Sequence, residues 1–120
     1  LWEKAVTGLP PALAGRAGEE LGRIYRRLGR PHEAARIWQA VVREHPLAHP
    51  GPLVELAKYH EHALRDLEGA RQWTLRALEA ARVRSALRGS PVRGASSAEL
   101  LHRLRRLERK LATGHPRQAG

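Results

Sequence analysis

Residues 36–46 read RIWQAVVREHP, and residues 1–10, LWEKAVTGLP, repeat part of that pattern. In both stretches a Trp is followed three residues later by a small or β-branched apolar residue and eight residues later by Pro. The two tryptophans, Trp2 and Trp38, are 36 residues apart, and so are the two prolines. This recurrence predicts a repeated structural unit with a period in the middle thirties.

Outside these two stretches the apolar residues also recur at helical spacings, and no segment alternates as a strand would. Segments rich in Gly, Pro and Ser interrupt the helical pattern. The expected elements are a helix tail at 1–8 and helices at 11–28, 31–44, 53–64, 67–83 and 97–112. The sequence therefore predicts an all-α protein whose helices come in pairs.

Two of these helices carry apolar stripes that indicate a buried face. The expected stripes are Leu21, Ile24, Tyr25 and Leu28 on the second element, and Leu100, Leu104, Leu107 and Leu111 on the last helix. Asp66 is expected to cap the helix at 67–83, and Ser96 with Glu99 forms a capping box for the last helix.

The helix pairs also recur in register. Three further pairs of residues are 36 positions apart: Ala34 and Ala70, Trp38 and Thr74, and Val41 and Ala77. Two helices per period are typical of a helical solenoid, in which each repeat buries its apolar face against its neighbours. The repeated tryptophans are therefore expected to be buried between layers, each removing about 150–250 Å² from water. The alternative interpretation is that they stack on nucleic-acid bases.

The first complete unit resembles the tetratricopeptide-type repeat. The residues that carry the resemblance are Leu21, Gly22, Tyr25, Gly29, Ala34, Trp38 and Pro46. Gly18 and Val41 depart from the usual pattern, where a large apolar residue and Ala are common. In the second unit His60 stands at the Tyr place and Thr74 replaces the aromatic residue.

This resemblance implies a right-handed solenoid of helical hairpins closed by a C-terminal capping helix. Residues 1–83 would hold a partial first unit and two full units, 84–96 a loop, 97–112 the capping helix and 113–120 a disordered tail. Because the chain lacks an initial Met and opens on a helix tail, we expect a fragment of a longer protein. The incomplete first hairpin would be completed by a missing segment or by a second copy of the chain, as a homodimer.

A second, narrower resemblance involves residues 55–78 and 102–112. They are similar to the helical region that follows the nuclease domain in bacterial ribonuclease-H-like exonuclease proteins of the four-carboxylate type. The matching residues are Ala57, Lys58, Tyr59, Glu61, His62, Leu64, Asp66 and Trp73. This resemblance implies an auxiliary region of a nuclease, and it carries over no catalytic residue because those carboxylates would lie in another domain.

Positive charge is concentrated in the second half of the chain. Of the formal net charge of +10, residues 1–70 carry +1 and residues 71–120 carry +9. An acidic protein segment, RNA, DNA or a phosphate surface fits this charge, and a solvated arginine-rich face is the alternative. The chain has no Cys, no apolar run near 18 residues and no signal-peptide pattern, so we expect a cytoplasmic protein without a membrane partner.

No constellation in the sequence predicts catalysis. The one Asp suits a helix cap, the Ser residues lie near one loop, and no Gly-rich phosphate loop follows a strand. His60 and His62 would point about 200° apart on a helix and so would not share a metal ion; His45 and His49, in a Pro-rich loop, are the remaining pair. We predict no enzyme activity, no metal and no cofactor, and we expect His60 to pack inward and bond a carbonyl group.

Two basic surfaces are the candidate binding sites. First helices line the inner groove of tetratricopeptide arrays, and here that groove would present Arg16, Arg23, Arg27, Lys58 and His62. Guanidinium groups suit carboxylates and phosphates. Glu19 interrupts the basic pattern, however, and the alternative is a solvated face with internal Glu–Arg pairs.

The second basic surface lies on the last helix. Its residues are Arg103, Arg106, Arg109 and Lys110, of which Arg103, Arg106 and Lys110 share one side. This surface would bind nucleic-acid phosphates with a strong dependence on salt, or it would face water while the leucine stripe caps the solenoid. Few aromatic residues, 4% of the chain, limit stacking on single strands.

The predicted function is therefore a non-catalytic protein–protein interaction module of helical repeats. Its groove would bind an acidic or extended segment of another protein or of its own parent chain. The alternative is an auxiliary nucleic-acid-binding region attached to a bacterial ribonuclease-H-like exonuclease.

Overall fold

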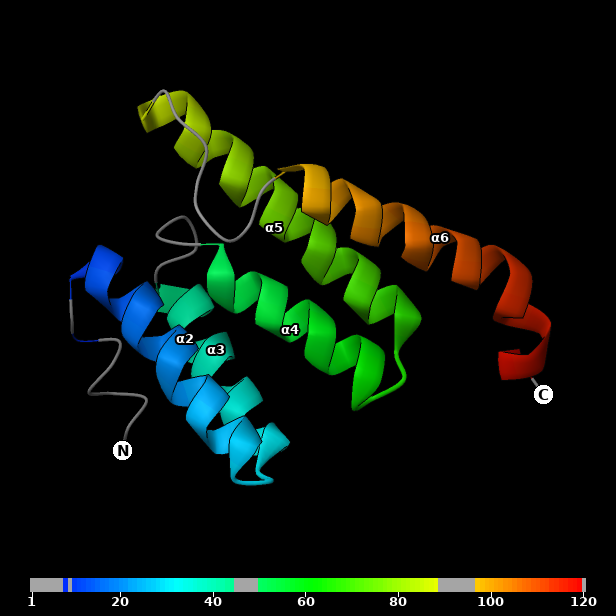
Figure 1. Ribbon diagram of the computed structural model, residues 1–120, viewed down its shortest axis with the longest axis horizontal. Coiled ribbons are helices and arrows are strands. Elements are labelled where there is room, and N and C mark those ends of the chain that lie inside the picture. Colours follow the sequence, from blue (N-terminus) through cyan, green and yellow to red (C-terminus); the bar gives the residue numbers. More distant parts are fainter. Residues whose placement is uncertain (1–7, 9, 45–49, 89–96, 120) are drawn as a thin grey trace.

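The computed structural model describes residues 8, 10–44, 50–88 and 97–119, and in these ranges it contains α-helices and no strand (Figure 1). The helices are α2 (Pro11–Arg27), α3 (Pro31–Glu44), α4 (Gly51–His62), α5 (Leu67–Arg88) and α6 (Ser97–Ala119). The prediction of an all-α protein is confirmed for this part of the chain. The molecule measures 44 × 36 × 20 Å, so its thickness is about that of two helices of roughly 10 Å each.

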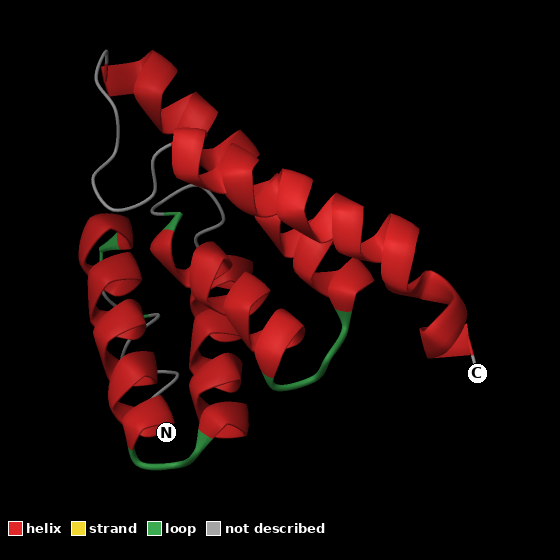
Figure 2. Cartoon of the chain, turned by 45° about the vertical axis from the view of Figure 1, so that its right-hand side comes forward, coloured by secondary structure: helices red, strands yellow, loops and turns green. Residues whose placement is uncertain are grey.

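Each described helix packs against the next one along the chain, and α2 also contacts α4. Helices α2 and α3 form one hairpin and α4 and α5 form a second beside it, as Figure 2 shows. Helix α6 then lies along α5. Helix α4 is central to this arrangement because it contacts α2, α3 and α5.

The turns of both hairpins follow from local sequence. Gly29 has a φ of +79° after α2, and the Arg30 N–H donates to the Tyr25 carbonyl, which is the hydrogen bond of a glycine-terminated helix. The second turn is closed by Asp66, whose Oδ1 accepts the Gly69 N–H at 2.9 Å. The prediction that Asp66 caps the following helix is confirmed.

The core centres on Trp38, whose side chain is 1% exposed. Its indole lies directly against α2, since a Cβ added to Gly22 would be 2.1 Å from Trp38 Nε1. The absence of a side chain at Gly22 is thus what admits the ring. Trp2, the other tryptophan expected in a layer, lies outside the described residues.

Three of the 36-residue pairs have both members in the described ranges, and all six of these residues are buried: Ala34, Ala70, Trp38, Thr74, Val41 and Ala77. Pro10, whose partner Pro46 lies outside those ranges, is exposed. Thr74, which stands where an aromatic residue was expected, satisfies its buried hydroxyl by donating to the Ala70 carbonyl at 2.8 Å.

The stripe predicted on α2 is wrong in part. Ile24 and Leu28 are 45% and 66% exposed, whereas Ala14, Gly18 and Gly22 are buried. The indole explains this, because α2 must present its small residues to the ring. On α6, by contrast, Leu100 and Leu107 are buried and the two other leucines of the predicted stripe are half-buried.

Three helix boundaries also differ from the prediction. Helix α4 covers Gly51–His62 instead of 53–64, with two prolines at its start that suit a first helical turn. Helix α5 continues to Arg88 through residues that had been assigned to the 84–96 loop, because no Gly or Pro interrupts the run before Gly89. Helix α6 continues to Ala119 through most of the segment expected to be a disordered tail. The proposed capping residue Ser96 lies outside the described residues.

Candidate anion-binding surface

Helix α4 contributes two buried carboxylates that organise the charged surface. Glu55 and Glu61 are only 2% and 4% exposed. Six residues on a helix correspond to about 600° of rotation, so the two side chains point about 120° apart. Glu55 therefore faces α2 and Glu61 faces α6. A buried carboxylate is costly unless it is paired and hydrogen-bonded, and each of these two is surrounded by cations from a neighbouring helix.

The cluster around Glu55 joins α2 to α4. Arg26 Nη1 donates to Glu55 Oε1 at 2.9 Å, and Arg23 Nη2 donates to Oε2 at 3.2 Å. Lys58 Nζ lies 3.7 Å from the same Oε2. Arg23 also pairs with Glu19 at 2.7 Å, and burial raises the pKa of Glu19, an effect that Arg23 opposes.

The structure places the residues predicted for the groove in two different settings. Arg23 and Lys58 converge on one carboxylate, but Arg16 and Arg27 are exposed and do not belong to this cluster. Arg26, which the sequence analysis did not select, takes the place expected of Arg27. The predicted interruption at Glu19 is real, because its carboxylate pairs with Arg23.

The cluster around Glu61 joins α4 to α6. Arg103 Nη1 and Arg106 Nη2 both donate to Glu61 Oε1, at 3.0 and 2.8 Å, and Lys110 Nζ donates to Oε2 at 3.1 Å. Burial by itself would raise the pKa of Glu61, but the Lys110 hydrogen bond and the charges of Arg106, His62 and Lys110 outweigh it and hold the pKa below its usual value. Glu61 is therefore an ionised anchor for α6.

The residues of the basic surface predicted on the last helix therefore fall into two groups with different surroundings. Arg103, Arg106 and Lys110 lie on one side, facing α4, where Glu61 binds all three. Arg109 is exposed and does not take part in this cluster. His62, predicted for the groove of the second unit, is also exposed and lies 3.6 Å from Glu61 Oε1 through its Nε2.

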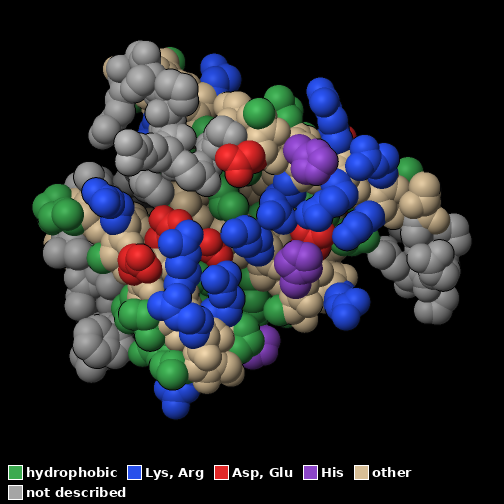
Figure 3. Space-filling view, viewed as in Figure 1, with side chains coloured by type: hydrophobic (Ala, Val, Ile, Leu, Met, Phe, Trp, Pro, Cys, Tyr) green, Lys and Arg blue, Asp and Glu red, His purple; other side chains and the backbone are tan. Residues whose placement is uncertain are grey.

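Both clusters carry more positive than negative charge. Together they hold six cations, Arg23, Arg26, Lys58, Arg103, Arg106 and Lys110, against the carboxylates of Glu19, Glu55 and Glu61. In Figure 3 the Lys and Arg side chains gather across the middle of this face, over α2, α4 and α6, with acidic side chains set among them. The face is thus cationic even after its internal ion pairs have formed.

Three hollows follow α4 across this face. The α4–α6 hollow has a volume of about 450 Å³ and is lined by Val54, Lys58, Ala98, Glu99, Leu100, His102, Arg103 and Arg106. The Trp38 hollow, of about 300 Å³, is lined by Arg26, Pro31, Trp38, Glu55, Lys58, Tyr59, His62 and Ala63. The third, of about 510 Å³, is lined by Glu61, His62, Arg65, Leu67 and Lys110. Lys58 lines the first two of these hollows and His62 lines the last two, so neighbouring hollows share a residue of α4.

The remaining histidines and aromatic rings on α4 and α5 have structural contacts. His60 was expected to bond a carbonyl group, but its Nδ1 instead pairs with Asp66 Oδ2 at 3.1 Å. The Gly69 N–H and the His60 hydrogen bond lower the pKa of Asp66, which suits its capping role. Arg76 covers the ring of Trp73 at 4.7 Å, and His32 bonds the Tyr59 hydroxyl.

The sequence did not predict a role at this site for the two buried glutamates or for Arg26, although Glu61 is among the residues of the exonuclease resemblance. A signal for Glu55 was present, because this acidic residue interrupts the apolar run LVELA at 53–57. No comparable signal marks Glu61, which lies between two histidines.

Two searches of the described residues give negative results. No group of three or more His, Cys, Asp or Glu side chains there is placed to hold a metal ion. No helix in the described ranges is long and apolar enough to cross a membrane. His45 and His49, the alternative metal pair, lie outside those ranges.

Comparison with known proteins adds no family assignment. No protein-family model matches the chain, and neither the curated proteins nor the solved structures contain a significant match. Functional inference therefore depends on the geometry of the cationic face.

Proposed function

We propose that this protein is a non-catalytic interaction module that binds an acidic segment of another protein, or of its own parent chain, along the face formed by α2, α4 and α6. The observation that carries the proposal is the pair of buried glutamates, each of which collects cations from a neighbouring helix. Guanidinium groups held in place by Glu55 and Glu61 lose little further side-chain entropy when they meet a ligand carboxylate.

A tetratricopeptide-like, right-handed solenoid is part of the proposal. It is supported by the consecutive packing of α2 to α6 and by the burial of the three 36-residue pairs that the structure describes in full. In such an array α2 and α4 are the first helices of successive units, and they supply the Glu55 cluster. Helix α6 would then be the cap that covers the last repeat with Leu100 and Leu107.

A protein segment suits this face better than a nucleic acid because apolar contact is available beside the charges. The Trp38 hollow is lined by Pro31, Tyr59 and Ala63 as well as by Arg26 and Lys58, so an acidic peptide with apolar side chains would find contacts of both kinds. Stacking of bases, in contrast, requires accessible aromatic faces. Trp38 is 1% exposed, and Trp73 is covered by Arg76.

The test is binding of labelled peptides measured by fluorescence anisotropy. A short peptide of Glu interspersed with Leu should bind, and a peptide with Lys in place of every Glu should not. Arg26→Gln and Lys58→Gln should each weaken binding about tenfold, since a hydrogen bond to a charged group contributes about 1.5–3 kcal/mol. Arg43→Gln is the matched control, because Arg43 is exposed and lines none of the three hollows. Equal binding of both peptides would contradict the proposal.

A second candidate function is the auxiliary nucleic-acid-binding region of an exonuclease. It is favoured by Arg105 and Arg109, which are exposed on α6 and take no part in the Glu61 cluster. Labelled single- and double-stranded nucleic acid should be titrated at low and at physiological salt, with the double variant Arg105→Glu, Arg109→Glu as the comparison. Salt-dependent binding that this variant abolishes would favour the second candidate, and no binding at low salt would exclude it.

A further inference from the structure

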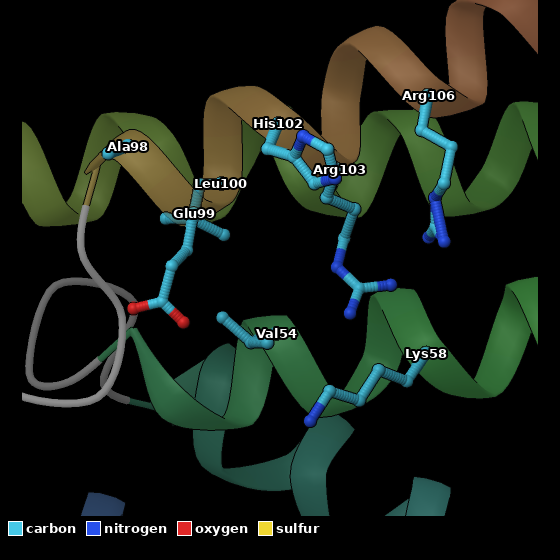
Figure 4. Close-up of a pocket in the computed structure, with 8 residues that line it drawn as sticks. All are labelled: Val54, Lys58, Ala98, Glu99, Leu100, His102, Arg103 and Arg106. Carbon is cyan, nitrogen blue, oxygen red and sulfur yellow. The ribbon is translucent and has the colours of Figure 1, made fainter.

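The α4–α6 hollow is distinct from the apolar hollow at Trp38 in both chemistry and position. Lys58 on α4 and Arg103 and Arg106 on α6 line it with three positive charges, and His102 adds an imidazole. Figure 4 shows Arg103 and Arg106 extending from α6 toward the space between the two helices, and Lys58 running along α4 at the edge of the same hollow. Glu99 is the one carboxylate among the lining residues.

The two arginines that line this hollow are positioned by Glu61. Arg103 and Arg106 each donate one terminal nitrogen to Glu61 Oε1, at 3.0 and 2.8 Å, and a guanidinium group has five N–H donors in a rigid planar fork. Glu61 can therefore hold each guanidinium group in place without using all of that group's N–H donors. Lys58, whose side chain is 39% exposed, lines the same hollow from α4.

These charges suit a dianion better than a monoanion. The cations lie on two walls of the hollow. A tetrahedral phosphate group can accept hydrogen bonds from both walls, because its oxygens point in several directions, whereas the oxygens of a carboxylate lie in one plane. The remaining wall is partly apolar, because Val54, Ala98 and Leu100 line the same hollow. The volume of about 450 Å³ accommodates a small organic group as well as the phosphate.

From this arrangement we propose that the α4–α6 hollow binds a phosphate monoester dianion, with the phosphate at Lys58, Arg103 and Arg106 and the ester group against Val54 and Leu100. This site shares Lys58 with the surface proposed for the acidic segment, but the phosphate proposal does not depend on peptide binding. Inorganic phosphate and an organic monoester share the recognised chemistry, and the apolar wall distinguishes them because only the ester contacts it.

Isothermal titration calorimetry with three probes tests the proposal at constant ionic strength. Phenyl phosphate should bind at least about tenfold more tightly than phenyl sulfate, which has nearly the same shape but a single negative charge. Inorganic phosphate should bind more weakly than phenyl phosphate and should compete with it. Equal affinity for the two phenyl esters would overturn the proposal, since it would show only general attraction of anions. Tighter binding of inorganic phosphate would overturn the assignment of the apolar wall.

Variants locate the site within the fold. Lys58→Gln should reduce the affinity for phenyl phosphate about fivefold or more. Because Lys58 is half-exposed, we expect this variant to fold normally, and its thermal unfolding checks this. Val54→Ala should reduce the preference for phenyl phosphate over inorganic phosphate. Arg109→Gln, an exposed change on the same helix that does not line the hollow, should leave both affinities unchanged. Equal losses in the Lys58 and Arg109 variants would place the bound anion elsewhere.

Discussion

Arg106 Nη2 lies 2.8 Å from Glu61 Oε1, although the two residues are 45 positions apart in the chain. This contact joins α6 to α4, two helices that both pack against α5. It also means that part of the basic surface on α6 is directed inward. The arginine surface is thus a set of ion pairs with an excess of positive charge, rather than an array of independent solvated cations.

Loss of the Glu61 charge should loosen α6. We expect Glu61→Gln to lower the free energy of unfolding by about 2 kcal/mol, which is below the usual cost of breaking a buried pair because its partners are partly exposed. Urea denaturation measures the change. Glu108→Gln is the control, because Glu108 is 49% exposed and lies 3.6 Å from Arg71, so its loss should cost under about 0.5 kcal/mol. Equal effects would show that Glu61 is not the anchor of α6.

Acid should destabilise the fold through the same carboxylate. The pKa of Glu61 is lowered in the folded state, so its contribution is present above the unfolded value near 4.3 and is lost as the pH falls through the lower folded value. The pKa of Asp66 is also lowered, so the stability that its carboxylate contributes is likewise lost as the pH falls. Glu19, whose pKa is raised, acts in the opposite sense, because protonation relieves its burial penalty.

Unfolding free energies measured between pH 7 and pH 3 test this dependence. The wild-type protein should lose more stability over that range than Glu61→Gln, and the two curves should converge at the acid end. Parallel curves with a constant separation would contradict the assigned role of the Glu61 charge.

The contact between Gly22 and Trp38 predicts a cost for any side chain at position 22. Gly22→Ala would place a Cβ 2.1 Å from Trp38 Nε1, and we expect a loss of about 1–3 kcal/mol from overpacking. Adding Trp38→Leu should remove the clash, so the double variant should be more stable than the sum of the single changes predicts. Thermal unfolding of the wild type, the two single variants and the double variant gives the coupling free energy between positions 22 and 38. Simple additivity would show that the indole does not lie against α2.

Gly29 offers a different kind of test, because its constraint is in the backbone. Its φ is +79°, and no atom lies within 4 Å of an added Cβ. Gly29→Ala should therefore cost about 1–2 kcal/mol from backbone conformation alone. No second substitution in the core should recover the stability lost in Gly29→Ala, whereas Trp38→Leu should relieve the clash in Gly22→Ala.

The helices were largely predictable because apolar periodicity and turn residues are local properties. Asp66 as a cap and the burial of Trp38 follow from such signals. The exposure of Ile24 and Leu28 was not predictable, since it depends on how the indole meets Gly22 across two helices. The charge clusters were hidden for a similar reason: each joins residues from separate helices, and periodicity along α6 cannot show that a glutamate on α4 faces it.

We propose that buried carboxylates hold the cations of this face in position for an acidic segment. Glu55→Gln tests it most directly, because it makes the face more positive while removing the charge that holds Arg23 and Arg26. Affinity for the Glu- and Leu-containing peptide should fall several-fold in this variant, and should be unchanged in Glu79→Gln, which alters an exposed pair with Arg82. An affinity that rises in the Glu55 variant, as attraction by net charge alone requires, would contradict the claim.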